Sequence, residues 1–92
     1  MPRWDARTDA NQHAIVKALR KCGARVHLLY REGRGCPDLL VGYRGVNLLI
    51  EVKTESGELT KREAQWHHNW PGQVDIVRTV EEAVHLLMEV GL

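Results

Sequence analysis

The sequence lacks long apolar runs and has only two cysteines. No stretch approaches the ~20 apolar residues of a transmembrane helix. The N-terminal Met-Pro-Arg-Trp-Asp also lacks the apolar core of a signal peptide. Cys22 and Cys36 do not have Cys-x-x-Cys spacing, which favours two reduced thiols. We therefore expect a cytoplasmic protein that makes no membrane contact.

The chain also has almost no excess of positive over negative charge. The 92 residues carry a formal net charge of +1, so the total charge does not indicate a nucleic-acid binder. The distribution is uneven, because the central third holds the basic residues Arg31, Arg34, Arg44, Lys53, Lys61 and Arg62. A basic region of this kind would suit a phosphate backbone. Ordinary solvated surface charge explains it equally well.

Repeats, linkers and low-complexity segments are likewise missing. A chain of 92 residues is long enough for one domain to fold without disulfides or a structural metal. We expect a single domain over residues 1–92, with residues 1–8 as a flexible arm.

Two short apolar runs, residues 39–43 and 46–50, occupy the centre of the chain. Each is too short for an ordinary helix, and an Arg-Gly turn separates them, so the pair predicts a β-hairpin. With a two-residue loop at residues 44–45, counting outward along both strands puts Asp38 opposite Glu51. The hairpin therefore brings two carboxylates together at its open end.

These carboxylates would repel each other without a partner. Opposed residues of an antiparallel pair have Cβ atoms about 4.5–5.5 Å apart, and like charges so placed are destabilising. Lys53 points to the same face as Glu51, because side chains alternate with period two along a strand. A divalent cation between Asp38 and Glu51 would turn the repulsion into a binding site.

Two other interpretations of these residues stay open. The charges at positions 38, 51 and 53 could form an ordinary solvated salt bridge at the strand ends. A three-residue loop with a bulge would shift the pairing by one and move Asp38 to the opposite face, unless the bulge itself restores the alignment.

The rest of the chain predicts three helices and two further strands. Helices are expected over residues 9–22, from residue 60 to about residue 70, and from residue 79 onward, with strands over residues 25–30 and 74–78. Asp9 is the expected N-cap of the first helix. The second and third begin with capping-box patterns, Thr60 with Glu63 and Thr79 with Glu82. Buried stripes are expected at Ile15, Ala18, Leu19 and Cys22, and at Val80, Ala83, Val84 and Leu87.

The predicted fold class is therefore α/β, a mixed four-stranded sheet in the order helix, three strands, helix, strand, helix. Both faces of the central hairpin are apolar, which indicates helices on both faces of the sheet. The aromatic pair Trp66 and Trp70 has i, i+4 spacing, for which core or subunit packing is favoured over base stacking. The adjacent His67 and His68 cannot face each other on a helix, so a zinc site is disfavoured.

Pro37-Asp38, a spacer of 12 residues, and Glu51-Val52-Lys53 resemble the Pro-Asp…(Asp/Glu)-x-Lys signature of the restriction-endonuclease-like nucleases. The sequence is also similar to small stand-alone VRR-NUC nucleases of phages and bacteria. The similar segments are residues 35–42, residues 50–53, and Leu59-Thr60 before a helix rich in Trp and His. The likeness runs from about Asp9 to Leu87. It implies the αβββαβ core of that superfamily with one extra C-terminal helix, and the cytoplasm of a bacterium or of a phage-infected host.

The resemblance also implies roles for individual residues. Asp38, Glu51 and the backbone carbonyl of Val52 would bind Mg²⁺, for which Mn²⁺ would substitute, and Lys53 would be the third catalytic residue. Relatives carry a polar or acidic residue on the first helix and a Gln near position 63, so Gln12, Asp9 and Glu63 are candidate supporting residues. Asp9 and Glu63 also fit simple capping roles. Arg31, Arg34, Lys61 and Arg62 are the candidate DNA contacts.

These assignments predict a Mg²⁺-dependent DNA endonuclease. The stand-alone relatives suggest a homodimer that cuts branched DNA, including four-way Holliday junctions, without a nucleotide cofactor. A general nicking or flap nuclease is an alternative of the same class. A nuclease-like fold that only binds DNA or pairs subunits is an alternative of another class, although opposed carboxylates facing DNA would not help such a module.

Overall fold

The computed structural model describes residues 6–29 and 31–90, with side chains from residue 10 onward. Its elements are α1 (Ala6–Lys21), β1 (Arg25–Leu28), β2 (Leu39–Tyr43), β3 (Val46–Val52), α2 (Lys61–Asn69), β4 (Asp75–Val77) and α3 (Val80–Val90). This is the element order that the sequence predicts. No helix in the described part of the chain is both long and apolar enough to cross a bilayer.

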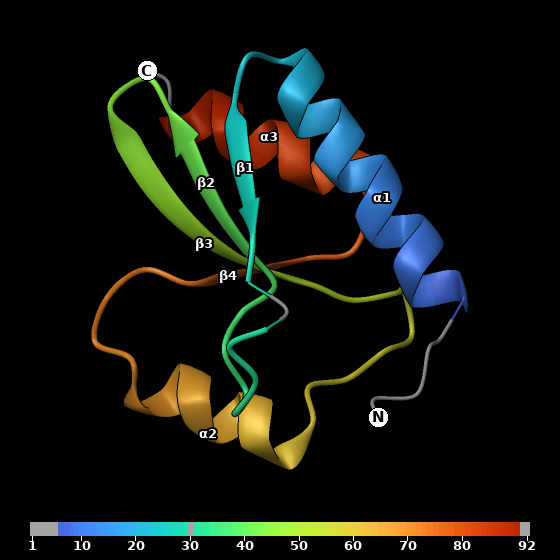
Figure 1. Cartoon of the computed structure of the whole chain (residues 1–92), viewed down its shortest axis with the longest axis vertical. Coiled ribbons are helices and arrows are strands. Elements are labelled where there is room, and N and C mark those ends of the chain that lie inside the picture. The colour runs from blue at the N-terminus through green and yellow to red at the C-terminus, as the bar shows by residue number, and fades with distance from the viewer. Residues whose placement is uncertain (1–5, 30, 91–92) are drawn as a thin grey trace.

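The four strands form one mixed sheet in the order β1-β2-β3-β4. The first three are antiparallel, and β4 is parallel to β3. Helices α1 and α3 pack against each other and cover one face of the sheet (Figure 1). Helix α2 lies beyond one end of the strands, on the side opposite to α1 and α3. The prediction of a mixed four-stranded sheet packed with helices is confirmed.

The apolar core lies between the sheet and the α1–α3 pair. Residues of the two predicted stripes are fully buried there, with Ile15 and Leu19 from α1 and Ala83 and Leu87 from α3. Burial of each large aliphatic side chain contributes about 1.5–3 kcal/mol to folding. Cys22 was predicted in the first stripe but is exposed, because α1 ends at Lys21 and the chain turns away at Gly23, whose φ is +98°.

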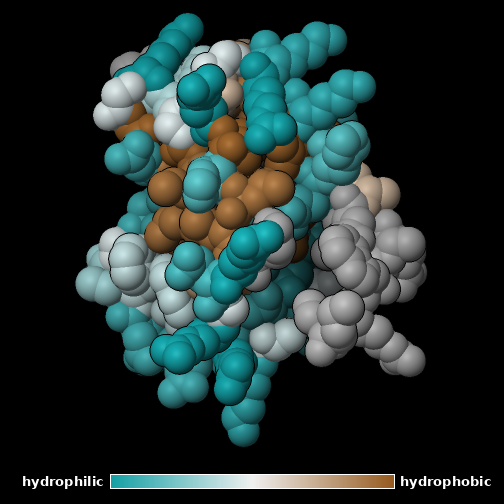
Figure 2. Space-filling model, in the orientation of Figure 1, coloured by the Kyte–Doolittle hydropathy of each residue, from teal (hydrophilic) through white to brown (hydrophobic). Residues whose placement is uncertain are grey.

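The opposite face of the sheet is only partly covered, which differs from the expectation that the hairpin is buried on both sides. Leu40 is 39% exposed and Ile76 is 38% exposed. Leu40 pairs with the half-buried Leu49, so these side chains share this face. Figure 2 shows apolar surface at the centre of the molecule. We call Leu40, Leu49 and Ile76 the open apolar face; it stays open because α2 covers only the end of the sheet.

The hairpin register is the predicted one. Tyr43 pairs with Val46 and Leu39 with Ile50. The turn residues Arg44 and Gly45 both have positive φ, 48° and 80°, as a two-residue type I′ turn requires. The bulged three-residue loop is therefore wrong, and the register brings Asp38 to Glu51.

The N-terminal part of the chain differs from its prediction. Helix α1 begins at Ala6, so Asp9 lies within the helix and is not its N-cap. Residues 6–8, expected in a flexible arm, are helical, while residues 1–5 of that arm lie outside the described residues. Strand β1 ends at Leu28, and the predicted last residue of this strand, Tyr30, is also outside the described residues.

Candidate active site

Asp38 and Glu51 meet at the end of β3 that faces α2. The Asp38 carboxylate accepts a hydrogen bond from the Val52 backbone N–H at 2.8 Å. The Asp38 carbonyl accepts another from Leu29 N–H, also at 2.8 Å. Asp38 therefore ties β1 to β3 and is fixed beside Glu51.

Glu51 is a buried carboxylate, only 1% exposed. Burial raises the pKa of Glu51 to about 10, and a hydrogen bond with Asp38 and the negative charges of Asp38 and Glu63 add to the effect. The positive charge of Lys53 lowers the pKa but does not compensate. Without a cation at this position, Glu51 is therefore neutral around pH 7.

Lys53 lies between two carboxylates. Its Nζ is 3.9 Å from Glu51 Oε2 and 2.6 Å from Glu63 Oε1. The shorter contact is a charge-assisted hydrogen bond, which is stronger than a neutral one. Lys53 is thus held on the Glu51 face of the sheet, as the period-two alternation predicts.

Glu63 has two structural roles. It completes the capping box of α2, because its side chain accepts from Thr60 N–H while the Thr60 side chain accepts from Glu63 N–H. The same carboxylate binds Lys53. Burial raises its pKa, but the hydrogen bonds from Lys53 and Thr60 N–H outweigh burial, so the pKa of Glu63 is lowered. The capping box therefore places the ionised Glu63 carboxylate beside Lys53.

His67 is a site residue that the sequence reasoning did not identify. Its Nε2 lies 3.8 Å from Glu51 Oε1. Within the described structure, both of these buried atoms lack a hydrogen-bond partner. His67 follows Glu63 by one helical turn and so shares its face of α2. The i, i+4 spacing of Glu63 and His67 was the sequence signal that could have predicted this position. From the sequence, His67 was considered only as part of a zinc site with His68.

The supporting contact from α1 comes from Asn11. Its Nδ2 donates to the carbonyls of Lys53 at 2.8 Å and Arg78 at 3.1 Å, which fixes the end of β3 to β4 and α1. Gln12 is half-buried one position along, and the side chain of Asp9 is outside the described set. The supporting role predicted for Gln12 and Asp9 stays a prediction, and Asn11 is the α1 residue with hydrogen bonds to this end of the sheet.

The four candidate DNA-contacting residues lie in the loop before β2 and on α2, the two segments beside the site. Arg31, Arg34, Lys61 and Arg62 are all exposed. Arg34 and Gly35 have positive φ, 56° and 82°. A Cβ at Gly35 would lie 2.5 Å from the Arg62 carbonyl oxygen, so glycine is required where this loop meets α2.

The residues present fit a hard divalent cation. Such an ion binds in proteins through one or two carboxylates while keeping several waters. Asp38 and Glu51 supply two carboxylates, and Glu51 Oε1 is a buried oxygen without a hydrogen-bond partner among the described residues. No group of three or more His, Cys, Asp or Glu side chains among the described residues forms a complete metal cage. The donor set suits Mg²⁺ or Mn²⁺ better than a structural zinc.

The comparisons with known proteins bear on the fold. No protein-family model and no curated protein matches the sequence. A solved structure described as a VRR_NUC domain is 27% identical, with a TM-score of 0.74 over 91% of this chain and 97% of that chain. The fold and the motif order therefore lead to one conclusion, which is that the chain has the fold of the VRR-NUC domain family.

Proposed function

We propose that this protein is a metal-dependent endonuclease that hydrolyses DNA phosphodiester bonds. The similarity to a VRR_NUC domain supports a nuclease-domain function. The observation that carries the proposal is Glu51, a carboxylate that is 1% exposed and lies beside Asp38. Burying a carboxylate beside a second carboxylate is unfavourable unless a cation or a shared proton compensates for the cost.

Each residue of the site has a distinct task in this proposal. Asp38 and Glu51, with the Val52 carbonyl, would hold Mg²⁺ or Mn²⁺, which when bound activates water and neutralises phosphate charge. Lys53 would position the attacking water and stabilise charge on the phosphate. Glu63 would hold the Lys53 ammonium beside the site, at the 2.6 Å contact. Asn11 would fix the backbone that carries Lys53.

We further propose that the protein works as a homodimer on branched DNA, including four-way junctions. The open apolar face of Leu40, Leu49 and Ile76 supports a second copy, because exposed apolar patches mark interaction surfaces. A two-fold dimer would carry two symmetric active sites, which suits paired cuts in two strands. The exposed arginines near the site suit the phosphate backbones of such a substrate.

Two alternatives predict different behaviour. A general nicking or flap nuclease would use the same site without a preference for junctions. A DNA-binding module would not need Lys53 between two carboxylates, since repulsion between carboxylates and phosphates weakens DNA binding.

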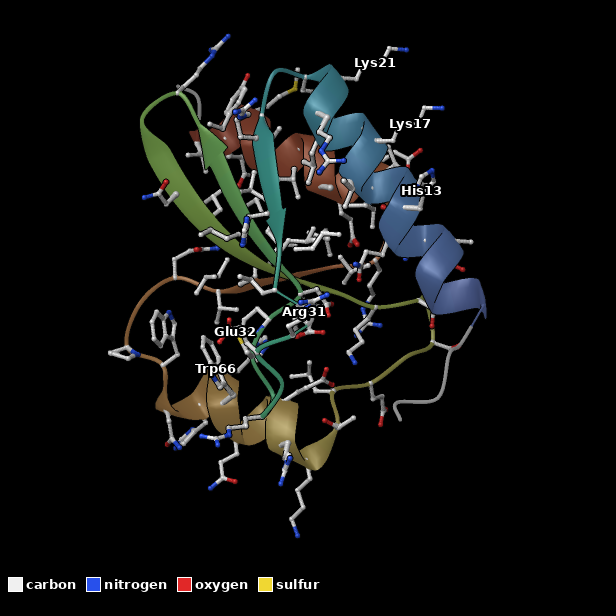
Figure 3. The ribbon with its side chains drawn as sticks, viewed as in Figure 1. His13, Lys17, Lys21, Arg31, Glu32 and Trp66 are labelled. Atoms are coloured by element: carbon white, nitrogen blue, oxygen red, sulfur yellow. The ribbon has the colours of Figure 1, made fainter. Side chains whose placement is uncertain are left out.

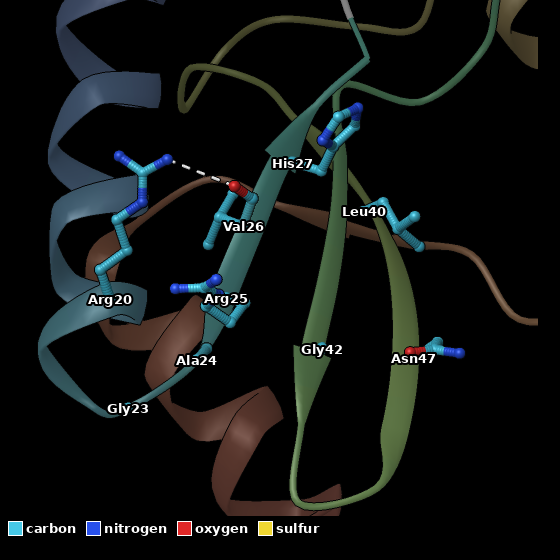
Figure 4. A pocket seen from close by; sticks show the side chains of 9 residues that line it. All are labelled: Arg20, Gly23, Ala24, Arg25, Val26, His27, Leu40, Gly42 and Asn47. Carbon is cyan, nitrogen blue, oxygen red and sulfur yellow. Dashed lines mark hydrogen bonds between the residues drawn. The ribbon is translucent and has the colours of Figure 1, made fainter.

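The test is cleavage of labelled DNA with Mg²⁺, Mn²⁺ or EDTA. The substrates are a four-way junction, a flap, a nicked duplex, a plain duplex and a single strand. Lys53→Ala and Asp38→Ala are compared with Lys17→Ala, a matched control because Lys17 lies on α1 far from α2 (Figure 3). Paired symmetric junction cuts that are lost in EDTA and in both site variants are expected. Cuts in every substrate would remove the junction preference, and binding without any cleavage would leave a binding module.

A further inference from the structure

A pocket of about 470 Å³ opens beside the active site, between the loop before β2 and α2. Its volume lies in the range of small-ligand sites. Its walls combine aromatic, amide and basic side chains: Arg34, Arg62, Gln65, Trp66, Asn69 and Trp70. We call it the aromatic pocket. None of the contacts described above for Asp38, Glu51 and Lys53 involves these residues.

Two tryptophans form one wall of the aromatic pocket. Trp66 and Trp70 stack with ring centroids 4.7 Å apart and planes 20° apart. The Trp70 ring is held in place by its Nε1, which donates to the Gln73 carbonyl at 3.2 Å. The ring also lies against Gly72, where a Cβ would come within 2.9 Å of Nε1. Trp70 is still 42% exposed, so a rigid aromatic surface faces solvent.

Two arginines form the other side of the aromatic pocket. Arg34 adopts a left-handed backbone conformation, with φ of 56°, which is unfavourable for a residue with a side chain. It is held there because Gly35 packs against the Arg62 backbone. The contact between the loop and the helix therefore brings the backbones of both arginines to the same opening, which the two residues line.

The aromatic pocket is connected to the active site through α2. Trp66 contacts the His67 ring edge-on, with centroids 6.0 Å apart, and His67 faces Glu51. Figure 3 shows Trp66 directed from α2 toward the strand ends and the loop that carries Arg31 and Glu32. His67 therefore links the Trp66 side of the aromatic pocket to the Glu51 carboxylate.

We propose that the aromatic pocket binds one unpaired nucleobase of the DNA strand beside the phosphate that is cut. This inference rests on the proposed function and names the feature of the substrate that the enzyme selects. The exposed Trp70 ring would stack on the base, as aromatic side chains do in proteins that bind single strands. Gln65 and Asn69 provide amide groups for the base edge, and Arg34 and Arg62 provide charge for the flanking phosphates.

A second copy of the chain is a poorer occupant of the aromatic pocket. A two-fold contact brings each surface against itself, so Arg34 and Arg62 of one copy would meet arginines of the other. Like charges that face each other across an interface are unfavourable. An anionic strand with a flat apolar base matches both the charge and the shape of the pocket.

The experiment compares two DNA duplexes with the same single-stranded arm, one intact and one with an abasic sugar at the first unpaired position. Both have identical phosphates, so the ratio of their dissociation constants isolates the base. Binding is measured by fluorescence anisotropy in EDTA, where no cleavage is needed. Trp70→Leu removes the aromatic ring and Trp70→Phe retains one, while Met88→Ala changes a 66% exposed residue on α3 as a control.

The wild type, Met88→Ala and Trp70→Phe are expected to bind the intact arm about 5- to 150-fold more tightly, the range for one base–aromatic stack. Trp70→Leu should lose this preference, and Arg62→Gln should weaken both duplexes alike. Equal binding of both duplexes by the wild type would overturn the proposal, as would a preference that persists in Trp70→Leu or disappears in both Trp70 variants. A protein that cuts no DNA but prefers the intact arm would refute the nuclease function and leave the pocket standing.

Discussion

The two faces of the β-sheet differ in what they contact: one packs in the apolar core and the other carries the candidate site. On β3, Leu48, Ile50 and Val52 point into the apolar core under α1 and α3. Glu51, which alternates with them, points to the other side and meets Lys53 and His67. One strand therefore contributes to stability with one face and to the site with the other, because its side chains alternate with period two.

Helix α2 differs from α1 and α3 in how it is held. It has no buried residue, whereas α1 and α3 contribute core residues. Its attachments are polar or local: the Thr60 cap, the Glu63–Lys53 ion pair and the packing of Gly35 against Arg62. Elements with few buried apolar contacts are the ones that open at low free-energy cost. The candidate site therefore lies between the well-packed sheet and a helix that is held by few apolar contacts.

The largest expected effect is on the site side. Lys53→Ala should lower the cleavage rate by about 10²–10⁴-fold, the range for a positioned acid–base group. Thermal unfolding should change little by comparison, since Lys53 lies outside the core. Rates on the preferred substrate and circular dichroism melting curves measure both. A variant that cuts DNA at the wild-type rate would contradict the assignment of Lys53.

A substitution in the apolar core should lower stability and leave the cleavage rate unchanged. Leu19→Ala removes a fully buried side chain of α1 and should lower the free energy of unfolding by about 2–5 kcal/mol. The folded fraction should retain its cleavage rate per active molecule. Urea titration monitored by circular dichroism measures the change, and Lys17→Ala is the exposed control on the same helix. A stability loss below that of Lys17→Ala would argue against the described core.

A third expected effect is the pH dependence of stability that arises from Glu51. The pKa of Glu51 is about 10 in the folded protein, against about 4.5 for an ordinary glutamate. Protonated Glu51 therefore stabilises the folded state, and this contribution is fully present below the unfolded pKa. That contribution is lost as pH rises toward the folded value. Metal-free protein should therefore lose stability with rising pH, by up to about 1.4 kcal/mol per pH unit from this group.

Glu51→Gln is the variant that isolates this effect. It should remove the Glu51 contribution to the pH slope, and Mg²⁺ should raise the melting temperature of the wild type only. Melting curves at several pH values, with EDTA or Mg²⁺, give both quantities. Identical pH slopes in the two proteins would mean that Glu51 is already ionised without metal.

The smallest effect on stability is expected on the open apolar face. Leu40→Glu changes a 39% exposed residue, so the unfolding free energy should shift by about 0.5 kcal/mol or less. If this face joins two copies, the same change should convert a dimer into a monomer, as light scattering after size exclusion would record. Met88→Ala should leave the assembly unchanged. Dimers that persist in Leu40→Glu would require another interface.

Local patterns predicted much of the site. The hairpin register follows from a two-residue turn and period-two alternation, and it was enough to bring Asp38, Glu51 and Lys53 together. The capping box at Thr60 and Glu63 was also readable, because its hydrogen bonds span only three residues. At Thr79 the pattern is met in part: Thr79 Oγ1 accepts from Glu82 N–H, but the Glu82 carboxylate accepts from Arg78 N–H.

Other features depended on contacts between distant segments. Asn11 reaches Lys53 across 42 residues, and no spacing rule distinguishes it from Gln12. The position of His67 beside Glu51 depends on where the loop before β2 allows α2 to lie. The open apolar face arose in the same way, since the apolar pattern of the hairpin predicts burial but does not say which helix supplies it.

The sequence by itself determined the order of the elements, the pairing of the hairpin and the three charges at its end, because each follows from the periodicity of neighbouring residues. The tertiary structure alone decided that α1 and α3 share one face, that α2 lies beside the candidate site, and that His67 and Asn11 contact its residues. The physical reason is that these contacts join segments far apart in the chain, whose relative placement is set by packing of the whole domain.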